Sequence, residues 1–332
     1  MARRPWGESG GGRLVIRAPN HLGDLVMAIP ALQAESADVL VLRWLAPLLA
    51  MADLPGAVIP FDRGFSGFLR AARTVRSERY CRGVLLPPSL SSALLLGAGG
   101  VRELRGTATD GRRPLLSSVV DLADAKSMHR SALYHFLVTG VRPAETLVPR
   151  LKVSEAARGS WGKLAGDHAL RTVGLFPGSN ASSRRWDAAR WKDLAGHLVA
   201  SGRNVVVFGS ASERELTAEV AGTSAFDAGG KTDLAVLAAG LAGCELFISN
   251  DSGPLHLAAA VGTSTLSLWG AGDPAITGLT GGAHRMLRRA DLACVPCVRN
   301  VCPRTGPGYI LEAAERECLC LIRVDDVLAA VS

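Results

Sequence analysis

The second half of the chain alternates short apolar runs with helical segments, and this pattern restricts the fold more than any other feature. Apolar strands are expected at 171–176, 204–209, 245–249 and 264–269. Helices are expected at about 188–200, from residue 213, at 233–244 and at 254–262. Strands that are apolar throughout, each followed by a helix, are typical of a parallel sheet covered on both faces. We therefore predict a doubly wound α/β domain.

The first half shows the same alternation less regularly, with strands expected near 13–17, 38–42, 57–60 and 83–86. A length of 332 residues exceeds that of one typical domain. We predict two Rossmann-like domains, residues 1–160 and 167–332, joined near 148–166. Ligands of such sheets bind beyond the carboxyl ends of the strands, and between domains that face each other.

The basic residues are concentrated in the first half. Residues 1–150 hold 19 Lys and Arg against 12 Asp and Glu, whereas residues 151–332 hold 18 of each. The excess fits a solvated basic surface, or an anionic partner such as an acidic membrane surface or a phosphorylated substrate. Nucleic acid is the least favoured partner, because the basic residues lack the aromatic interleaving of single-strand binders.

The sequence contains no uninterrupted apolar run of the roughly 18 residues that would predict a membrane span. The opening "MARRPWGESGGG" is basic but lacks the apolar stretch of a signal peptide. We interpret it as a disordered lead-in and expect a cytoplasmic protein.

The segment "SNDSGPLHLAAAVG" (249–262) is the strongest candidate for a ligand site. A buried strand is expected to end at its first residue, and its proline suits the first turn of a helix. A helix N-terminus presents N–H groups and a positive dipole end, both favourable for a phosphate. The expected phosphate-site residues are Asp251, Ser252, Gly253 and His256. The alternative is an ordinary turn capped by Asp251 or Ser252.

Two further strand ends lead into polar loops. "LFPGSNASSRRW" (175–186) contributes Ser179, Asn180 and Arg184, which can contact phosphate or ribose. "VFGSASERE" (207–215) contributes Gly209 and Glu213, whose carboxylate can accept hydrogen bonds from ribose hydroxyls. A flexible loop before a helix capped by Asp187 is the alternative for the first. Three polar strand ends in one domain favour a nucleotide site.

Several other chemistries are disfavoured or stay open. No G-x-G-x-x-G follows the first strand of either half, which disfavours a dinucleotide oxidoreductase. No Asp-x-Asp occurs, so we predict no metal–diphosphate site. Buried or reduced thiols, a structural metal and redox pairing all stay open for the cysteines near the end of the chain. These are Cys294, Cys297, Cys302, Cys318 and Cys320.

Asp24 lies in "RAPNHLGDLVMAIPAL" (17–32), where an expected strand turns into a helix. Leu25, Ile29 and Leu32 recur at helical spacing after it. Taken alone, an acid at this position is interpreted as a helix cap. The other motifs of the chain suggest a second role.

The ordered set of motifs resembles the lipopolysaccharide heptosyltransferases, most closely their heptosyltransferase II branch. The matching runs are "APNHLGDLVMAIPAL", "TATDGRRPLL" (107–116), "FPGSNASSRRW", "GGKTDL" (229–234), "SNDSGPLHLAAAVGT" and "CVPCVRNVCP". The resemblance implies a GT-B fold, in which two doubly wound Rossmann-like domains face each other across a cleft. It also implies transfer of a heptose from ADP-heptose, with inversion, to a hydroxyl of the lipopolysaccharide inner core. ADP-heptose is a donor substrate, and no cofactor is expected.

The resemblance implies roles for individual residues. Asp24 matches the catalytic base, and Arg184 matches a donor-contacting basic residue. Residues 251–253 match the donor-binding turn, with Asp251 near the sugar and the following amides at the diphosphate. Glu213 lies near an acid that meets the ribose.

Three positions depart from the family pattern. Arg184 stands where Lys is usual, which keeps the charge and adds a forked geometry. Asp187 follows Trp186 where Pro is usual, and His21 stands where an aromatic residue is frequent. The last two leave a different acceptor or sugar open.

The implied mechanism assigns a separate role to each half of the chain. Asp24 accepts the proton of the attacking hydroxyl, while Arg184 and the helix after Asp251 stabilise the departing ADP without a metal. The basic first half holds an anionic glycolipid acceptor near the inner membrane surface, with Arg112 and Arg113 as candidates. Because a helix N-terminus stabilises a carboxylate anion, we expect Asp24 to be a modest base before substrate binds.

Two other function classes stay open. One is a glycosyltransferase of the same fold that uses another nucleotide sugar or acceptor. The other is a non-catalytic sugar-nucleotide-binding protein, which the presence of Asp24 disfavours because binding alone needs no base.

Overall fold

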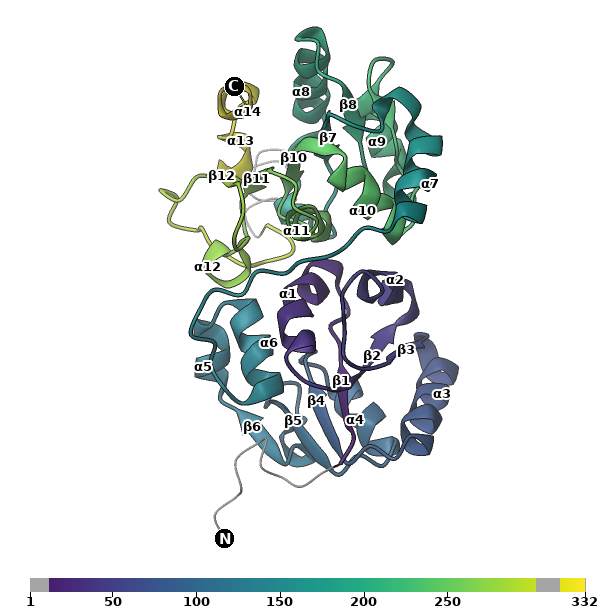
Figure 1. The fold of residues 1–332 in the computed structure, drawn as a ribbon. Helices are drawn as coiled ribbons and strands as arrows, with labels where there is room; N and C mark the ends of the chain where they lie inside the picture. The colour runs from purple at the N-terminus through teal and green to yellow at the C-terminus, as the bar shows by residue number, and fades with distance from the viewer. Residues whose placement is uncertain (1–11, 303–316, 332) are drawn as a thin grey trace. The chain divides into compact units, whose positions relative to one another are not determined.

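The computed structural model describes residues 12–302 and 317–331, so the expected lead-in at 1–11 lies outside the described residues. The chain separates into two compact units, residues 1–150 and residues 151–332, called the N-unit and the C-unit below. Each unit is built around its own parallel sheet with helices on both faces (Figure 1).

The N-unit sheet has the strand order β3-β2-β1-β4-β5-β6, and all of its pairings are parallel. Its strands are β1 (Leu14–Arg17), β2 (Asp38–Leu42), β3 (Val58–Phe61), β4 (Arg82–Leu85), β5 (Glu103–Thr107) and β6 (Ser118–Val120). Its helices are α1 (Leu22–Gln33), α2 (Ala46–Leu49), α3 (Gly64–Ser77), α4 (Leu90–Ala98), α5 (Leu122–Ser127) and α6 (Arg130–Thr139). The winding direction reverses between β1 and β4, which is where open α/β sheets bind their ligands.

The C-unit sheet has the order β12-β11-β10-β7-β8-β9, also parallel throughout. Its strands are β7 (Thr172–Phe176), β8 (Val205–Val207), β9 (Phe226–Asp227), β10 (Cys244–Asn250), β11 (Thr265–Trp269) and β12 (His284–Arg288). Its helices are α7 (Glu155–Ala165), α8 (Ala188–Ala200), α9 (Arg214–Ala221), α10 (Leu234–Ala242), α11 (Gly253–Ala260), α12 (Pro274–Thr277), α13 (Glu317–Cys320) and α14 (Val324–Val331). Counted from its first strand, this sheet has the same winding as the N-unit, with its reversal between β7 and β10.

Both units therefore confirm the predicted doubly wound α/β class. The C-unit strands β7, β8 and β11 are buried at every residue, as the sequence pattern required. Residues 155–165 of the expected connector form α7, which packs against α10 inside the C-unit. In the described part of the chain, no helix combines the length and apolarity needed to cross a membrane.

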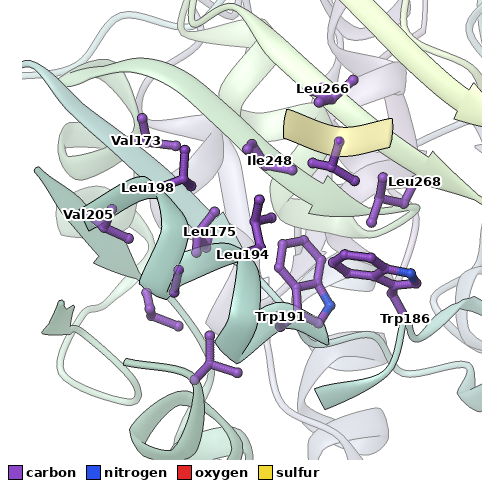
Figure 2. Packing of buried hydrophobic residues seen from close by; sticks show 14 of the residues in the cluster. Val173, Leu175, Trp186, Trp191, Leu194, Leu198, Val205, Ile248, Leu266 and Leu268 are labelled. Atoms are coloured by element: carbon purple, nitrogen blue, oxygen red, sulfur yellow. The ribbon is translucent and has the colours of Figure 1, made fainter. Parts of the chain in front are cut away.

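The core of the C-unit is formed by aliphatic side chains of its strands and helices and by two tryptophans (Figure 2). Trp191 lies on α8 and is fully buried. Trp186 lies at the end of the loop between β7 and α8, and its ring meets that of Trp191 edge-on, with centroids 5.2 Å apart. The indole Nε1 of Trp186 donates to the carbonyl of Ile322 at 2.9 Å. The loop after β7 is thus anchored in the core at its far end.

Candidate active site

Two strand ends of the C-unit lie side by side at the reversal of its sheet. Phe176 at the end of β7 pairs with Ser249, one residue before the end of β10. Since both strands are parallel, the loop after β7 (177–187) and the turn after β10 (251–252) leave the same edge of the sheet. The structure therefore brings together two of the three polar strand ends that the sequence singled out.

Asn250 joins these two strand ends. Its buried amide Nδ2 donates to the carbonyl of Pro177 at 2.7 Å, and its Oδ1 accepts from the backbone N–H of Trp186 at 3.0 Å. The side chain thus fixes both the beginning and the end of the loop that carries Arg184. The sequence pattern did not single out Asn250 for this function.

Arg184 forms an ion pair with Asp251, with Nη1 and Oδ2 separated by 3.0 Å. The Asp251 side chain is only 3% exposed, whereas that of Arg184 is 26% exposed. A Cβ built on Gly272 would lie 2.1 Å from Asp251 Oδ2, so only glycine leaves room for the carboxylate there. Asp251 is therefore enclosed and orients Arg184, and in this structure it is not open to a sugar as the resemblance implied.

The loop after β7 forms hydrogen bonds both within itself and to the turn after β10. Ser179 is buried, and its hydroxyl donates to the Asp251 carbonyl at 3.5 Å. The Nε of Arg185 donates to the carbonyl of Ser179 at 2.6 Å. Asn180 is exposed at the edge of the loop. Asp187 caps α8 by accepting from two backbone N–H groups, as predicted.

The N-cap residue of α11 makes no capping hydrogen bond. Ser252 occupies this position, and its hydroxyl lies 3.0 Å from that of Ser249. Capping of the turn by Ser252, one of the two expected alternatives, is therefore wrong. Gly253 begins the helix, and His256 is buried in its first turn. Backbone N–H groups at an uncapped helix start suit an anionic ligand.

Glu213 links the third strand end to the first. Its Oε2 accepts from the backbone N–H of Ser210 at 2.9 Å and from the Ser210 hydroxyl at 2.7 Å. A Cβ built on Gly178 would lie 1.9 Å from its Oε1, so the carboxylate occupies the space that a side chain at 178 would fill. Gly209 is restricted in the same way by Thr217. All three polar strand ends therefore gather at one edge of the C-unit sheet.

In the N-unit, Asp24 is the third residue of α1, and the N-cap position is occupied by His21. The Oδ1 of Asp24 accepts a hydrogen bond from the Tyr134 hydroxyl at 3.0 Å and lies 3.9 Å from Nε of Arg130. Among the described residues, no helix N–H group donates to this carboxylate. The interpretation of Asp24 as a helix cap is therefore wrong. Its side chain is 32% exposed, so it is open to a substrate.

Tyr134 is a buried donor that turns the Asp24 carboxylate toward α6. Burial, reinforced by the negative charge of Asp24, raises the pKa of Tyr134 well above its ordinary value. Its hydroxyl therefore stays protonated and can only donate to the carboxylate. The two residues are 110 positions apart in the chain, and no local sequence signal could have paired them.

Arg112 was expected to bind an acceptor, but the structure buries its side chain. Its side chain is fully buried and donates to the carbonyls of Thr107 at 2.9 Å, Pro87 at 2.6 Å and Ser89 at 3.2 Å. Burial lowers the pKa of Arg112 to about 10. By donating to carbonyls of both segments, Arg112 fixes the loop after β4 to the loop after β5. Carbonyl oxygens at these strand ends can accept such bonds because sheet pairing does not occupy them. Arg113 beside it is exposed.

Arg17 is a second buried arginine at the same edge of the N-unit sheet, and the sequence did not single it out. It donates to the Ala18 carbonyl and to Asn20 Oδ1, and its guanidinium stacks on Phe61 at 4.6 Å. Burial lowers the pKa of Arg17 to about 9. The residue braces the loop that leads to Asp24. Together with Arg112 it leaves positive charge at the carboxyl ends of the strands.

Among the described residues, the five cysteines near the end of the chain are not arranged as ligands of a metal ion. Cys294 is exposed, and the other four cysteines of the cluster are partly buried. Within residues 12–302 and 317–331, no group of three or more His, Cys, Asp or Glu side chains is arranged to hold a metal ion.

Known proteins resemble this chain in both sequence and architecture. The family model described as "Glycosyltransferase family 9 (heptosyltransferase)" matches residues 68–306. Lipopolysaccharide heptosyltransferase 2 of Escherichia coli is 26% identical over 301 residues, covering 80% of this chain and 84% of the relative. The solved structure of E. coli ADP-heptose lipopolysaccharide heptosyltransferase II matches with a TM-score of 0.80 at 25% identity, covering 96% of this chain and 97% of that one.

A glycosyltransferase family 9 structure from Veillonella parvula, with a TM-score of 0.80 at 22% identity, covers 96% of each chain and supports the fold. The doubly wound units are thus those of GT-B heptosyltransferase structures. Since the family match extends over most of the sequence, this chain belongs to glycosyltransferase family 9, the heptosyltransferases.

Proposed function

We propose that this chain transfers a heptose from ADP-heptose to a hydroxyl of the lipopolysaccharide inner core, inverting the anomeric carbon. Family membership and the similarity to heptosyltransferases 2 supply the reaction class and the substrates. The C-unit holds the donor. The N-unit supplies the base and holds the acceptor.

The observation that carries the proposal is the state of the Asp24 carboxylate. Its Oδ1 is held by Tyr134, while the side chain is one-third exposed and is not used to cap its own helix. A held but accessible carboxylate suits a general base, which must reach the proton of the attacking hydroxyl within hydrogen-bond distance. A protein that only binds sugar nucleotides would not need this arrangement.

On the donor side, the leaving ADP needs positive charge at its diphosphate. Arg184 is oriented by Asp251, and the uncapped start of α11 adds N–H groups at the same edge of the sheet. Both are fixed before substrate arrives, and preorganised donors stabilise developing charge with little reorganisation. We propose that they take the place of a metal ion, while Glu213, Ser179 and Asn180 contact the nucleoside.

On the acceptor side, the positive charge of the N-unit favours the phosphates and acid sugars of a glycolipid core. Arg17 and Arg112 contribute this charge from buried positions, and Arg113 is the exposed candidate for a direct contact. Because such an acceptor is anchored in a membrane, we propose that the protein works in the cytoplasm at the inner membrane surface.

A donor and transfer assay tests the proposal. ADP-heptose is expected to bind in calorimetry more tightly than UDP- or GDP-sugars, and incubation with a heptose-deficient core acceptor is expected to release ADP in step with a product heavier by one heptose. Preference for another nucleotide sugar would overturn the donor assignment. Tight ADP-heptose binding without transfer to any core acceptor would favour the binding-protein alternative.

A further inference from the structure

Helix α3 of the N-unit presents an apolar stripe to solvent. Phe65 is 80% exposed and Leu69 is 36% exposed. Their spacing of four residues places them on one side of the helix, and Arg73 continues the same line. The opposite side, with Gly67, Ala71, Ala72 and Val75, is buried against the unit. We call the stripe of Phe65, Leu69 and Arg73 the α3 face.

A further large apolar side chain is exposed between β2 and β3. Trp44 is 49% exposed and sits in the short turn Arg43–Leu45 after β2. Nε of Arg43 donates to Asp62 Oδ1 at 2.8 Å, so this turn is joined to the residues that lead into α3. Single exposed apolar residues are ordinary on protein surfaces, but exposed apolar side chains on two joined segments indicate a contact surface.

Positive charge predominates around the α3 face, although Asp62 and Glu78 flank the helix. Residues 63–77 contain four arginines and no acidic residue. Within the described part of the chain, Arg63 and Arg73 have no ion-pair partner, whereas Arg70 pairs weakly with Asp62 at 3.5 Å. An exposed helix with aromatic and aliphatic side chains on one line and arginines around it has the composition of an interfacial membrane helix. Long arginine side chains can reach headgroup phosphates while their stems cover apolar surface.

We propose that the α3 face, together with Trp44, docks the protein on an anionic phospholipid surface. Phe65, Leu69 and Trp44 enter the boundary between headgroups and acyl chains, and Arg63, Arg70 and Arg73 meet lipid phosphates. The choice of a lipid occupant rests on the proposed function, because the proposed acceptor is anchored in a membrane. Charge complementarity supports it independently, since an anionic leaflet attracts each nearby arginine.

Vesicle sedimentation with the full chain tests this inference without any substrate. Vesicles of phosphatidylglycerol mixed with phosphatidylcholine are compared with phosphatidylcholine alone, at low and at high salt. We expect at least about tenfold stronger partitioning onto the anionic vesicles at low salt, and a marked loss at high salt. The double variant Phe65→Ser, Leu69→Ser is expected to partition about tenfold less. Arg73→Glu is expected to lose at least about fivefold, the effect of one basic residue near an anionic surface.

Two matched variants in the C-unit serve as controls. Leu170→Ser removes an apolar side chain that is 68% exposed, and Arg158→Glu reverses the charge of an exposed arginine. Both are expected to partition as the unchanged protein does. ADP binding verifies that the C-unit of every variant is folded, and circular dichroism with thermal unfolding verifies the N-unit.

Four results would overturn the inference: no partitioning onto anionic vesicles, equal losses in the control variants, Phe65-dependent self-association in sedimentation velocity without vesicle binding, or Phe65-dependent binding of poly(U) in its place. The vesicle assay needs neither donor nor acceptor. A protein that binds vesicles but transfers no heptose would therefore refute the proposed function and leave the docking surface standing.

Discussion

Asp24 shows how one residue's role depends on a partner far away in the chain. The sequence placed it correctly at the start of a helix and, through the resemblance, proposed it as the base. Local preference alone would have made it a cap, but α6 brings Tyr134 and Arg130 beside its carboxylate instead. That contact follows from the packing of α1 against α6, and nothing in the local pattern encodes it. The burial of Arg112 has a similar origin, because it depends on where the loops after β4 and β5 meet.

Replacing Tyr134 by Phe tests whether the hydrogen bond positions the base. The change removes only the hydroxyl, so kcat is expected to fall about tenfold, in line with the roughly 1.5 kcal/mol that a hydrogen bond to a charged group contributes. KM for ADP-heptose is expected to change less than twofold, because the donor is held by the C-unit. Steady-state kinetics with both substrates measure the two constants.

Tyr80→Phe is the matched control for this change. The Tyr80 hydroxyl donates to Asp38 Oδ2 at 2.6 Å, the same kind of bond at the opposite end of the strands. It is expected to leave kcat unchanged. Equal kcat losses in the two variants, or no loss in Tyr134→Phe, would show that Tyr134 has a structural role alone.

At the scale of elements, the loop between β7 and α8 connects the donor site to the core of the C-unit. Its composition predicted a ligand loop, and the residues Ser179 and Arg184 lie at the expected strand end. The contacts that hold it could not be predicted, because they come from Asn250 across the neighbouring strand end and from Trp186 in the core. The edge strands β9 and β12 were also missed. The first has two residues, and the second carries exposed polar side chains that hide the strand pattern.

Trp186→Phe tests the connection between core and loop. The variant loses the indole hydrogen bond to Ile322 and part of a buried ring, so the free energy of unfolding is expected to fall by about 1–3 kcal/mol. The affinity for ADP is expected to fall several-fold because Arg184 is held less firmly. Urea unfolding and calorimetry measure the two effects.

Trp161→Phe provides the comparison within the same unit. Trp161 is equally buried, and its indole donates to the Ala169 carbonyl at 3.0 Å, but it lies on α7 and not in the donor loop. We expect similar destabilisation with unchanged ADP affinity. If both variants lose ADP affinity equally, the loop is not positioned through Trp186.

For the whole molecule, the repeated winding of the two sheets explains why the fold was predictable. Apolar strands separated by helices leave few arrangements other than a doubly wound parallel sheet, and both units adopt the same strand order. The division of function follows from this repetition. Each reversal of winding offers one ligand edge, with the polar donor loops in the C-unit and the carboxylate and buried arginines in the N-unit.

The central claim is that Asp24 removes the proton from the attacking hydroxyl, and Asp24→Asn tests it most directly. The substitution keeps the size of the side chain and removes its basicity. Calorimetry is expected to give ADP-heptose binding within about twofold of the unchanged protein, and an unchanged circular dichroism spectrum and thermal unfolding midpoint show that the N-unit is folded. The turnover number for heptose transfer is expected to fall by about 10²–10⁴-fold, the range for loss of a general base. Near-normal turnover with intact ADP-heptose binding would contradict the account.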